Sequence, residues 1–302
     1  MGSKLEIKLY TTDEAKFIKI TDESIKRAKE IDYLFSNYRD DSVLYQVNEN
    51  AGNKTVKVPK EFIELTQLSI YYSKLTDGAF DITVGKLFNL WKSKGDQNEL
   101  PSKQDIEQSL ECIGYENIKI DEAKNEISFN VDCIKLDYGA IGKGYVVDEI
   151  MDIAKKNGVS KGLVNFGGNI YALSSPPNKK FWEVGIRKPG SDNEIISMVN
   201  LKNLGVATSG DYEKFFTIDG IRYSHILDPK TGLPVKDISS VTAVSKSATE
   251  SDVYSTAISV LGFEKFLEME KQKDLGILHI SKDQDKLVIK MSEKYQKIEL
   301  RK

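Results

Sequence analysis

A single α+β unit over residues 1–302 is the fold class that the sequence predicts. Segments with apolar residues at helical spacing alternate with short β-prone runs, and two such runs are joined by an Asp-Gly dipeptide typical of hairpins. No repeat, low-complexity tract or Pro/Gly linker divides the chain. Its 302 residues, 40% of them hydrophobic, are enough to bury a core. We therefore expect one continuous mixed α/β unit.

The charge balance excludes some partners. Lys and Arg number 43 against 46 Asp and Glu, a net charge of -3, so no overall positive field attracts nucleic acid or an anionic membrane. No apolar run reaches the roughly 20 residues that span a bilayer, and no signal-like segment precedes the first strand-like run, residues 5–10. Cys112 and Cys133 lack a metal-ligand spacing, and the sequence leaves open whether they meet.

The first helix is expected over residues 22–35, with Thr21 or Asp22 as its N-cap. A polar loop, residues 36–42, follows and contains Tyr38. A loop tyrosine is free to lie against a flat ligand, although an ordinary surface aromatic explains it equally well.

Asp81 stands out in the apolar segment 79–91, which follows a helix expected over residues 59–74. An unpaired carboxylate among apolar side chains is costly, so Asp81 either caps backbone groups or faces a ligand. Next come a short helix over 103–112 and a strand pair at 118–120 and 126–129.

Residues 134–148 pass from a strand through a glycine-containing turn into a helix that runs to about residue 156. Free backbone N–H groups and Lys143 make this junction a candidate anion site, although simple packing explains it too. Its spacing fits neither the P-loop nor the Rossmann pattern. Further on, Gly167 and Gly168 interrupt the strand-like run 163–172, which predicts a bulge or a close approach.

The most informative stretch is a predicted hairpin, with strands at 215–218 and 221–226, that follows a strand expected over 181–186. Period-2 alternation puts His225 on one face of the second strand, and Asp228 opens a sharp turn just beyond it. We expect an imidazole and a carboxylate close together here.

A lone histidine is often only a core or surface residue. Two polar turns flank His225, one at 208–211 and one at 228–232, and both are rich in groups that bind anions or orient side chains. The other histidine, His279, lies in an apolar run that looks like a buried strand.

A strand over 239–245 leads into a helix over 248–261 in which Asp252, Ser255 and Thr256 share one face. Three oxygen donors on one face suit a hard cation such as Mg²⁺. The alternative is helix capping, because Thr249 and Asp252 are spaced like an S/T-x-x-E box.

Seven segments in this order resemble the ApbE family of FAD:protein FMN transferases, which attach FMN to a threonine of a partner protein through a phosphoester. The segments are 1–3, 36–48, 77–91, 137–148, 165–172, 208–235 (with TSGDY and SHILDPKTGLPV) and 248–262. The resemblance covers nearly the whole chain. It implies a T-fold-like α+β unit with largely antiparallel sheets.

The resemblance also implies a set of site residues. FAD would contact Met1, Tyr38, Ala79, Phe80, Asp81, Asp137, Lys143 and Ile226. The metal would bind the carbonyl of Ala140 with Asp252 and Thr256, and Ser255 stands where the family has a small apolar residue or threonine.

The expected chemistry is Mg²⁺-assisted attack of a threonine hydroxyl on the FMN-side phosphorus of FAD, with AMP leaving. His225 would orient or deprotonate the hydroxyl, and Asp228 would steer its ring; a carboxylate near the metal is the alternative base. An FAD pyrophosphatase and a non-catalytic flavin-binding protein remain as alternatives.

By the same resemblance, the acceptor is an exported or membrane-tethered redox subunit with a threonine-containing motif near Ser/Thr-Gly-Ala-Thr. The enzyme is expected outside the cytoplasm, in the periplasm or on the bacterial cell membrane, often as a lipoprotein. No lipidation cysteine lies near the start of this chain.

Overall fold

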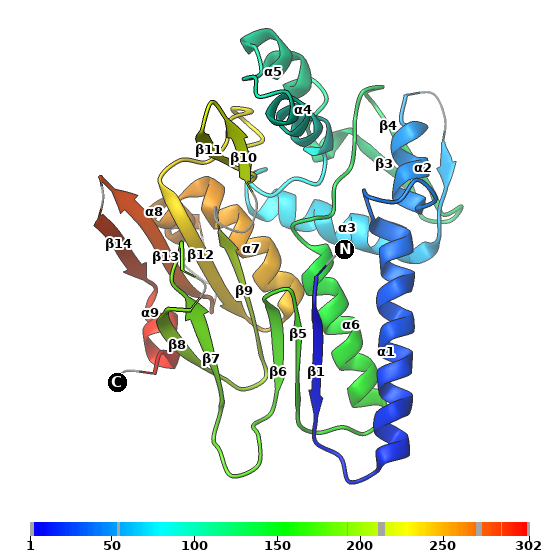
Figure 1. Cartoon of the computed structure of the whole chain (residues 1–302). Helices are drawn as coiled ribbons and strands as arrows, with labels where there is room; N and C mark the ends of the chain where they lie inside the picture. Colours follow the sequence, from blue (N-terminus) through cyan, green and yellow to red (C-terminus); the bar gives the residue numbers. More distant parts are fainter. Residues whose placement is uncertain are drawn as a thin grey trace.

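An antiparallel sheet forms the centre of the computed structural model, which describes residues 3–52, 55–191, 193–210, 215–269, 274–284 and 286–300 (Figure 1). In the described chain the sheet has seven strands in the order β1-β5-β6-β9-β12-β13-β14. They are β1 (Leu5–Leu9), β5 (Gly162–Phe166), β6 (Asn169–Leu173), β9 (Leu204–Gly210), β12 (Ile238–Ser245), β13 (Gly276–Asp283) and β14 (Lys286–Met291).

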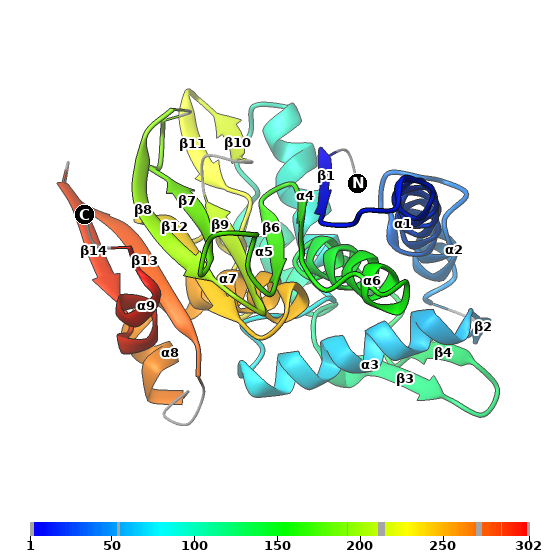
Figure 2. The same cartoon turned by 90° about the horizontal axis from the view of Figure 1, so that it is seen from below.

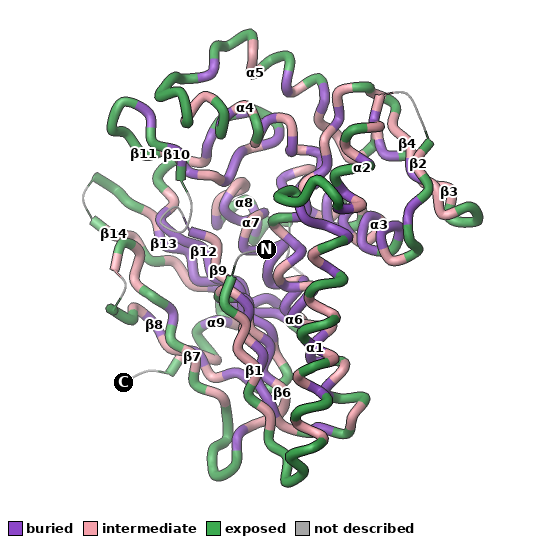
Figure 3. Tube along the Cα trace, turned by 45° about the vertical axis from the view of Figure 1, so that its right-hand side comes forward, coloured by how far each residue is buried: buried purple, intermediate pink, exposed green. Residues whose placement is uncertain are grey.

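Helices cover one face of this sheet. The helices α6 (Gly142–Lys156) and α7 (Ala248–Leu261) pack on the central strands, and α1 (Glu14–Phe35) packs on α6 (Figure 2). The main apolar core lies between them, and Figure 3 shows buried stretches where α6, α7, β9 and β12 meet. None of the helices in the described ranges combines the length and apolar character that crossing a bilayer requires.

A smaller core covers the opposite face. It joins the sheet to the ribbon of β7 (Trp182–Arg187) and β8 (Ile195–Leu201) and to α9 (Glu293–Ile298). The short helix α8 (Phe263–Met269) follows α7.

A second layer lies at the end of the sheet where the site forms. It contains α2 (Val43–Glu49), α3 (Lys60–Leu75), α4 (Gly85–Asp96), α5 (Lys103–Leu110) and a short sheet of β2 (Val56–Lys57), β4 (Glu126–Phe129) and β3 (Ile118–Asp121). The hairpin of β10 (Phe215–Ile218) and β11 (Ile221–Ser224) packs on α4, where Trp91 contacts Phe216 and donates from Nε1 to the Gly232 carbonyl over 2.9 Å.

The two predicted strand pairs are confirmed, and Asp219 and Gly220 have the positive φ angles, 50° and 75°, that the tight turn requires. The predicted start of the first helix is wrong. The N-cap is Asp13, whose side chain accepts from the Lys16 N–H, so the helix begins well before residue 22. Thr21 lies inside it, and its hydroxyl donates to the Phe17 carbonyl over 2.9 Å.

Two other expectations need correction. Gly167 and Gly168 form the turn between β5 and β6, with φ angles of 57° and 91°, so they connect two strands and do not bulge within one. The strand expected from residue 134 is reduced to a single bridge between Lys135 and Val84.

Cys112 and Cys133 form a disulfide, which the sequence had left open. It ties the end of α5 to the chain that enters the site.

Candidate functional site

A cavity of about 360 Å³ lies between the sheet and the second layer. Residues from across the chain line it, from Ser3 near the start to Thr256 on α7. The sequence-predicted residues among them are Tyr38, Ala79, Phe80, Asp81, Asp137, Ala140, Lys143, His225, Ile226, Asp252 and Thr256. The fold therefore gathers most of the predicted site around one space.

Three predicted residues are not among those that line the cavity, for two different reasons. Met1 lies outside the described residues. Asp228 and Ser255 are absent from the cavity lining, although Leu227, Pro229 and Thr256 beside them belong to it.

Asp252 is held between two elements at the cavity floor. Its side chain is buried, with 4% of the residue exposed. One carboxylate oxygen, Oδ2, accepts from the Gly144 N–H at the start of α6 over 3.0 Å. Burial raises the pKa of Asp252, while Lys143, Gly144 and Asn169 oppose that shift.

The capping interpretation of Asp252 is wrong. The N-cap of α7 is Ser247, whose side chain accepts from the Glu250 N–H over 3.0 Å. The next two N–H groups, of Ala248 and Thr249, donate to the Asp148 carboxylate over 2.9 and 2.8 Å. Since Ser247 and Asp148 accept from the N–H groups at the start of α7, the Asp252 carboxylate is not needed to cap this helix.

A glycine makes the Gly144 contact possible. A Cβ added at Gly144 would lie 2.4 Å from the Ala248 carbonyl oxygen, so no other residue fits there unless the helices move apart. The first turns of α6 and α7 therefore meet backbone to backbone, which brings the Gly144 N–H to Asp252.

Hydroxyl groups surround the other end of this face. Ser209 on β9 lies 3.3 Å from the Thr256 Oγ1 and 2.8 Å from the Ser255 Oγ. The Ser255 hydroxyl also donates to the Asp252 carbonyl over 2.9 Å. Ser255 therefore packs against strand and helix, and we leave it out of the metal ligands proposed below.

The Asp252 end of the cavity fits a Mg²⁺ ion. The Asp252 carboxylate and the Thr256 hydroxyl are hard oxygen donors, as is a backbone carbonyl such as that of Ala140, and a buried carboxylate gains from a bound cation. No cluster of three or more His, Cys, Asp and Glu side chains suited to a metal occurs in the described ranges. The expected set contains one carboxylate only.

Asp81 caps the backbone at the cavity wall. Its Oδ1 accepts from the N–H and hydroxyl of Thr83, and its Oδ2 accepts from the Tyr115 N–H over 3.0 Å. Burial nevertheless raises the pKa of Asp81. The choice left open by the sequence is thus resolved in favour of a cap that also borders the cavity.

Aromatic rings form another wall. Phe35, Phe80, Phe88 and Tyr138 line the cavity, and so does Tyr38, which lies on a loop with 70% of the residue exposed. The lining thus combines flat rings with charged groups such as Lys143, a combination that suits a ligand with a flat ring and a phosphate.

His225 follows directly after β11 and lines the cavity. The Asp228 carboxylate shapes the next turn, accepting from the Lys230 N–H over 2.8 Å and from the Thr231 hydroxyl over 3.0 Å. That Asp228 also steers the imidazole stays a prediction.

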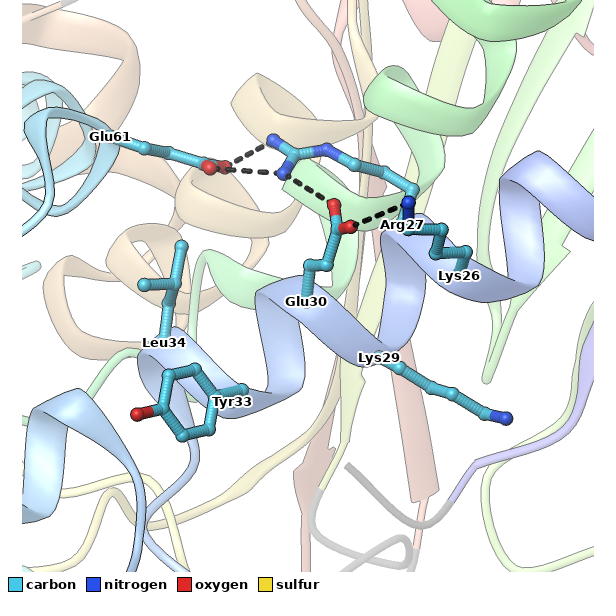
Figure 4. Close-up of a pocket in the computed structure, with 7 residues that line it drawn as sticks. All are labelled: Lys26, Arg27, Lys29, Glu30, Tyr33, Leu34 and Glu61. Carbon is cyan, nitrogen blue, oxygen red and sulfur yellow. Dashed lines mark hydrogen bonds and ion pairs between the residues drawn. The ribbon is translucent and has the colours of Figure 1, made fainter.

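A second, more open pocket lies beside α1 (Figure 4). Arg27 at its base pairs with Glu61 of α3 and with Glu149 of α6, and it lies 3.6 Å from Glu30. Glu61 also accepts from the Tyr145 hydroxyl over 2.9 Å. We interpret this network as a structural tie between three helices.

The α+β architecture and the lining of the cavity suit a protein that would bind a ligand with both a flat ring and an anionic group. Comparison with known proteins is more specific: the ApbE family matches residues 1–279, and the chain belongs to that family.

Relatives and solved structures agree with this assignment. A Klebsiella pneumoniae relative is 31% identical over 288 residues, covering 94% of this chain and 88% of the relative. An Escherichia coli K12 relative is 30% identical over 271 residues, covering 88% and 77%. Both are named FAD:protein FMN transferase.

The crystal structure of an ApbE protein from Thermotoga maritima has a TM-score of 0.90 at 32% identity, covering 99% of this chain and 97% of that one. The flavin transferase ApbE from Vibrio cholerae has a TM-score of 0.85 at 28% identity, covering 99% and 96%. These matches confirm the α+β class, and this chain is an enzyme of the flavin transferase family.

Sequence reasoning missed two polar residues of the site region. Thr208 and Ser209 were expected in a turn, but they lie on β9, and both residues line the cavity. The signal that could have indicated a strand is the apolar run 204–207, which Thr208 and Ser209 continue directly. Asp211, which belonged to the same expected turn, lies outside the described residues.

Proposed function

We propose that this protein is a Mg²⁺-dependent FAD:protein FMN transferase that moves FMN from FAD to a threonine hydroxyl of an acceptor protein and releases AMP. The observation that carries the proposal is the convergence of Asp252, Thr256, Lys143 and His225 on one aromatic-walled cavity. The names of the relatives support the transferase activity.

Each residue has a physical role in this proposal. Asp252, Thr256 and the Ala140 carbonyl would hold the metal, and Lys143 would bind a pyrophosphate oxygen. Bound Mg²⁺ supplies positive charge that stabilises the phosphate oxygens during transfer. Tyr38, Phe80 and Ile226 would bind the flexible dinucleotide and restrict its orientation.

His225 is the proposed general base. Its imidazole lines the cavity and would accept the proton of the threonine hydroxyl as the hydroxyl oxygen attacks phosphorus. The attack forms a phosphoester and breaks the pyrophosphate bond, and AMP leaves with the electron pair.

The partner is an acceptor protein with a threonine-containing motif, of the redox-subunit type. We place the reaction outside the cytoplasm, in the periplasm or at the cell membrane. The Cys112–Cys133 disulfide supports this location, because disulfides persist mainly in oxidising compartments.

The test is to incubate the protein with FAD and Mg²⁺, with and without an acceptor containing the motif, and to follow AMP, free FMN and protein-bound flavin. We expect AMP together with flavin fixed to the acceptor threonine. AMP with free FMN regardless of acceptor would make the protein a pyrophosphatase, and bound FAD without AMP would make it a flavin-binding protein.

A variant pair tests the metal ligands. Asp252→Ala should abolish Mg²⁺-dependent transfer and leave the fold intact. Asp152→Ala removes an exposed carboxylate on α6 that pairs with Lys155, and it should behave as the wild type. Full activity of Asp252→Ala would end the assignment of the metal site.

A further inference from the structure

Asn169 is the polar residue that connects the two charged parts of the site. It begins β6, directly after the Gly167–Gly168 turn, and only 1% of it is exposed. Its amide lies between Asp252 and Lys143, with the nitrogen 3.0 Å from the Asp252 Oδ1 and the oxygen 3.0 Å from the Lys143 Nζ. The neighbours set this orientation, because only with the nitrogen toward the carboxylate does each atom meet a complementary partner.

The local backbone fixes where the amide lies. The Asn165 side chain accepts from the Gly168 N–H over 3.0 Å, which stabilises the turn. Residue 169 pairs with Phe166 across the hairpin, so its backbone is held by the sheet. A buried amide held in this way has little freedom to follow a moving partner.

A neutral amide suits this position better than a charged group. A direct ion pair between Lys143 and Asp252 would use each charge to neutralise the other. A carboxylate has about four acceptor positions. Asp252 accepts one hydrogen bond from Gly144 and one from Asn169, which leaves positions for a metal. An ammonium has three donors, and the Asn169 oxygen takes one.

We propose that Asn169 is a positioning residue that fixes the metal-binding carboxylate of Asp252 relative to the anion-binding ammonium of Lys143. The inference rests on the proposed function, since it assigns a metal to Asp252 and a pyrophosphate oxygen to Lys143. The amide acts through these two residues and contacts neither the metal nor the flavin.

The first measurement is metal binding, with Mn²⁺ as the probe and calorimetry as the readout. Residues that orient metal ligands typically contribute about 10- to 100-fold to affinity, so Asn169→Ala should weaken Mn²⁺ binding by about 10-fold or more. In transfer assays the Mg²⁺ concentration for half-maximal rate should rise more than kcat falls. Asn157→Ala is the matched control, because its amide bonds Glu23 and the Ile153 carbonyl away from the cavity.

The second measurement is FAD affinity without metal, read by flavin fluorescence in excess chelator, in a double-mutant cycle. Asn169→Ala and Lys143→Met should each weaken binding, and the double variant should be weaker than Lys143→Met by less than twofold. Such non-additivity is expected when one residue acts through the other. A purely structural role of Asn169 would make the two effects multiply.

The inference is overturned if Asn169→Ala binds Mn²⁺ and FAD within twofold of the wild type, or if the cycle is additive. Should Asn169→Ala fail to fold, Asn169→Ser, which can keep at most one of the two contacts, takes its place in both measurements with the same criteria. If the wild type binds no Mn²⁺, the proposed metal site fails instead, and the FAD cycle still decides the link to Lys143.

Discussion

Removing the Cys112–Cys133 disulfide should destabilise the protein without disabling the site. The two cysteines are 21 residues apart in the chain. Closing a loop of that length restricts the unfolded chain by about 3 kcal/mol. With about 2.1 cal/mol/K of unfolding entropy per residue, 1 kcal/mol shifts the melting temperature of a chain of this length by roughly 1.6 °C, so the Cys112→Ala/Cys133→Ala variant should melt about 5 °C lower.

The site should survive at low temperature, because other contacts hold the chain that follows Cys133. The Gly85 N–H donates to the Lys135 carbonyl over 3.0 Å, and the Asp137 N–H donates to the Ile82 carbonyl over 2.7 Å. FAD affinity near room temperature should therefore stay within twofold of the wild type.

The assay is thermal unfolding by circular dichroism with and without reductant, alongside FAD binding. Thiol titration establishes that the bond is intact before reduction and open after it. A melting temperature that changes by less than about 2 °C on complete reduction would refute the chain-entropy argument. A loss of FAD affinity far below the melting temperature would show that the disulfide shapes the site directly.

Three other predictions concern packing, charge and the ring wall. Gly205→Ala should lower the free energy of unfolding, measured by chemical denaturation, by about 3 kcal/mol or more, because the new Cβ would lie 2.3 Å from the Ser247 backbone. In the control, Gly95→Ala, the new Cβ would lie 3.3 Å from the Phe216 side chain, and the free energy of unfolding should fall by less than about 1 kcal/mol. Burial raises the pKa of Asp148 above its usual 3.8, so the folded protein binds the carboxyl proton more tightly than the unfolded chain does. The contribution of Asp148 to wild-type stability is therefore lost as the pH rises through the pKa of the folded state. The loss of unfolding free energy in Asp148→Asn should be larger at about pH 4 than at about pH 7. Tyr38→Ala should weaken FAD binding by roughly 5- to 10-fold in a fluorescence titration and Tyr38→Phe by less than about twofold, if the ring contributes about 1 kcal/mol.

The β-hairpins and the helix at 248–261 could be predicted because local chemistry determines them. An Asp-Gly turn between two β-prone runs has few other solutions, and the structure confirms it. The start of α1 was missed for the opposite reason. Asp13, Thr21 and Asp22 are all acceptable N-cap residues. The helix begins after Asp13, and this earlier start places Ile20 within the helix, where it packs in the core.

Contacts between distant segments could not be read from local patterns. Asp252 could be singled out because it shares a helix face with Thr256, but its partners Gly144 and Asn169 come from two other elements. The pairing of Cys112 with Cys133 is likewise a matter of tertiary distance. Local rules identify which groups have chemistry to offer, and the packing of the layers decides which of them meet.

The pairing of β1 with β5 has a consequence for synthesis. Leu5 lies opposite Phe166 in the finished sheet, so β1 leaves the ribosome long before β5, the strand that pairs with it, has been made. Sequence-distant pairings of this kind form slowly. The segment of β1 should therefore remain accessible to proteases and chaperones until β5 has emerged. In pulsed proteolysis of stalled nascent chains, residues 5–9 should be protected only in chains that extend well past residue 166.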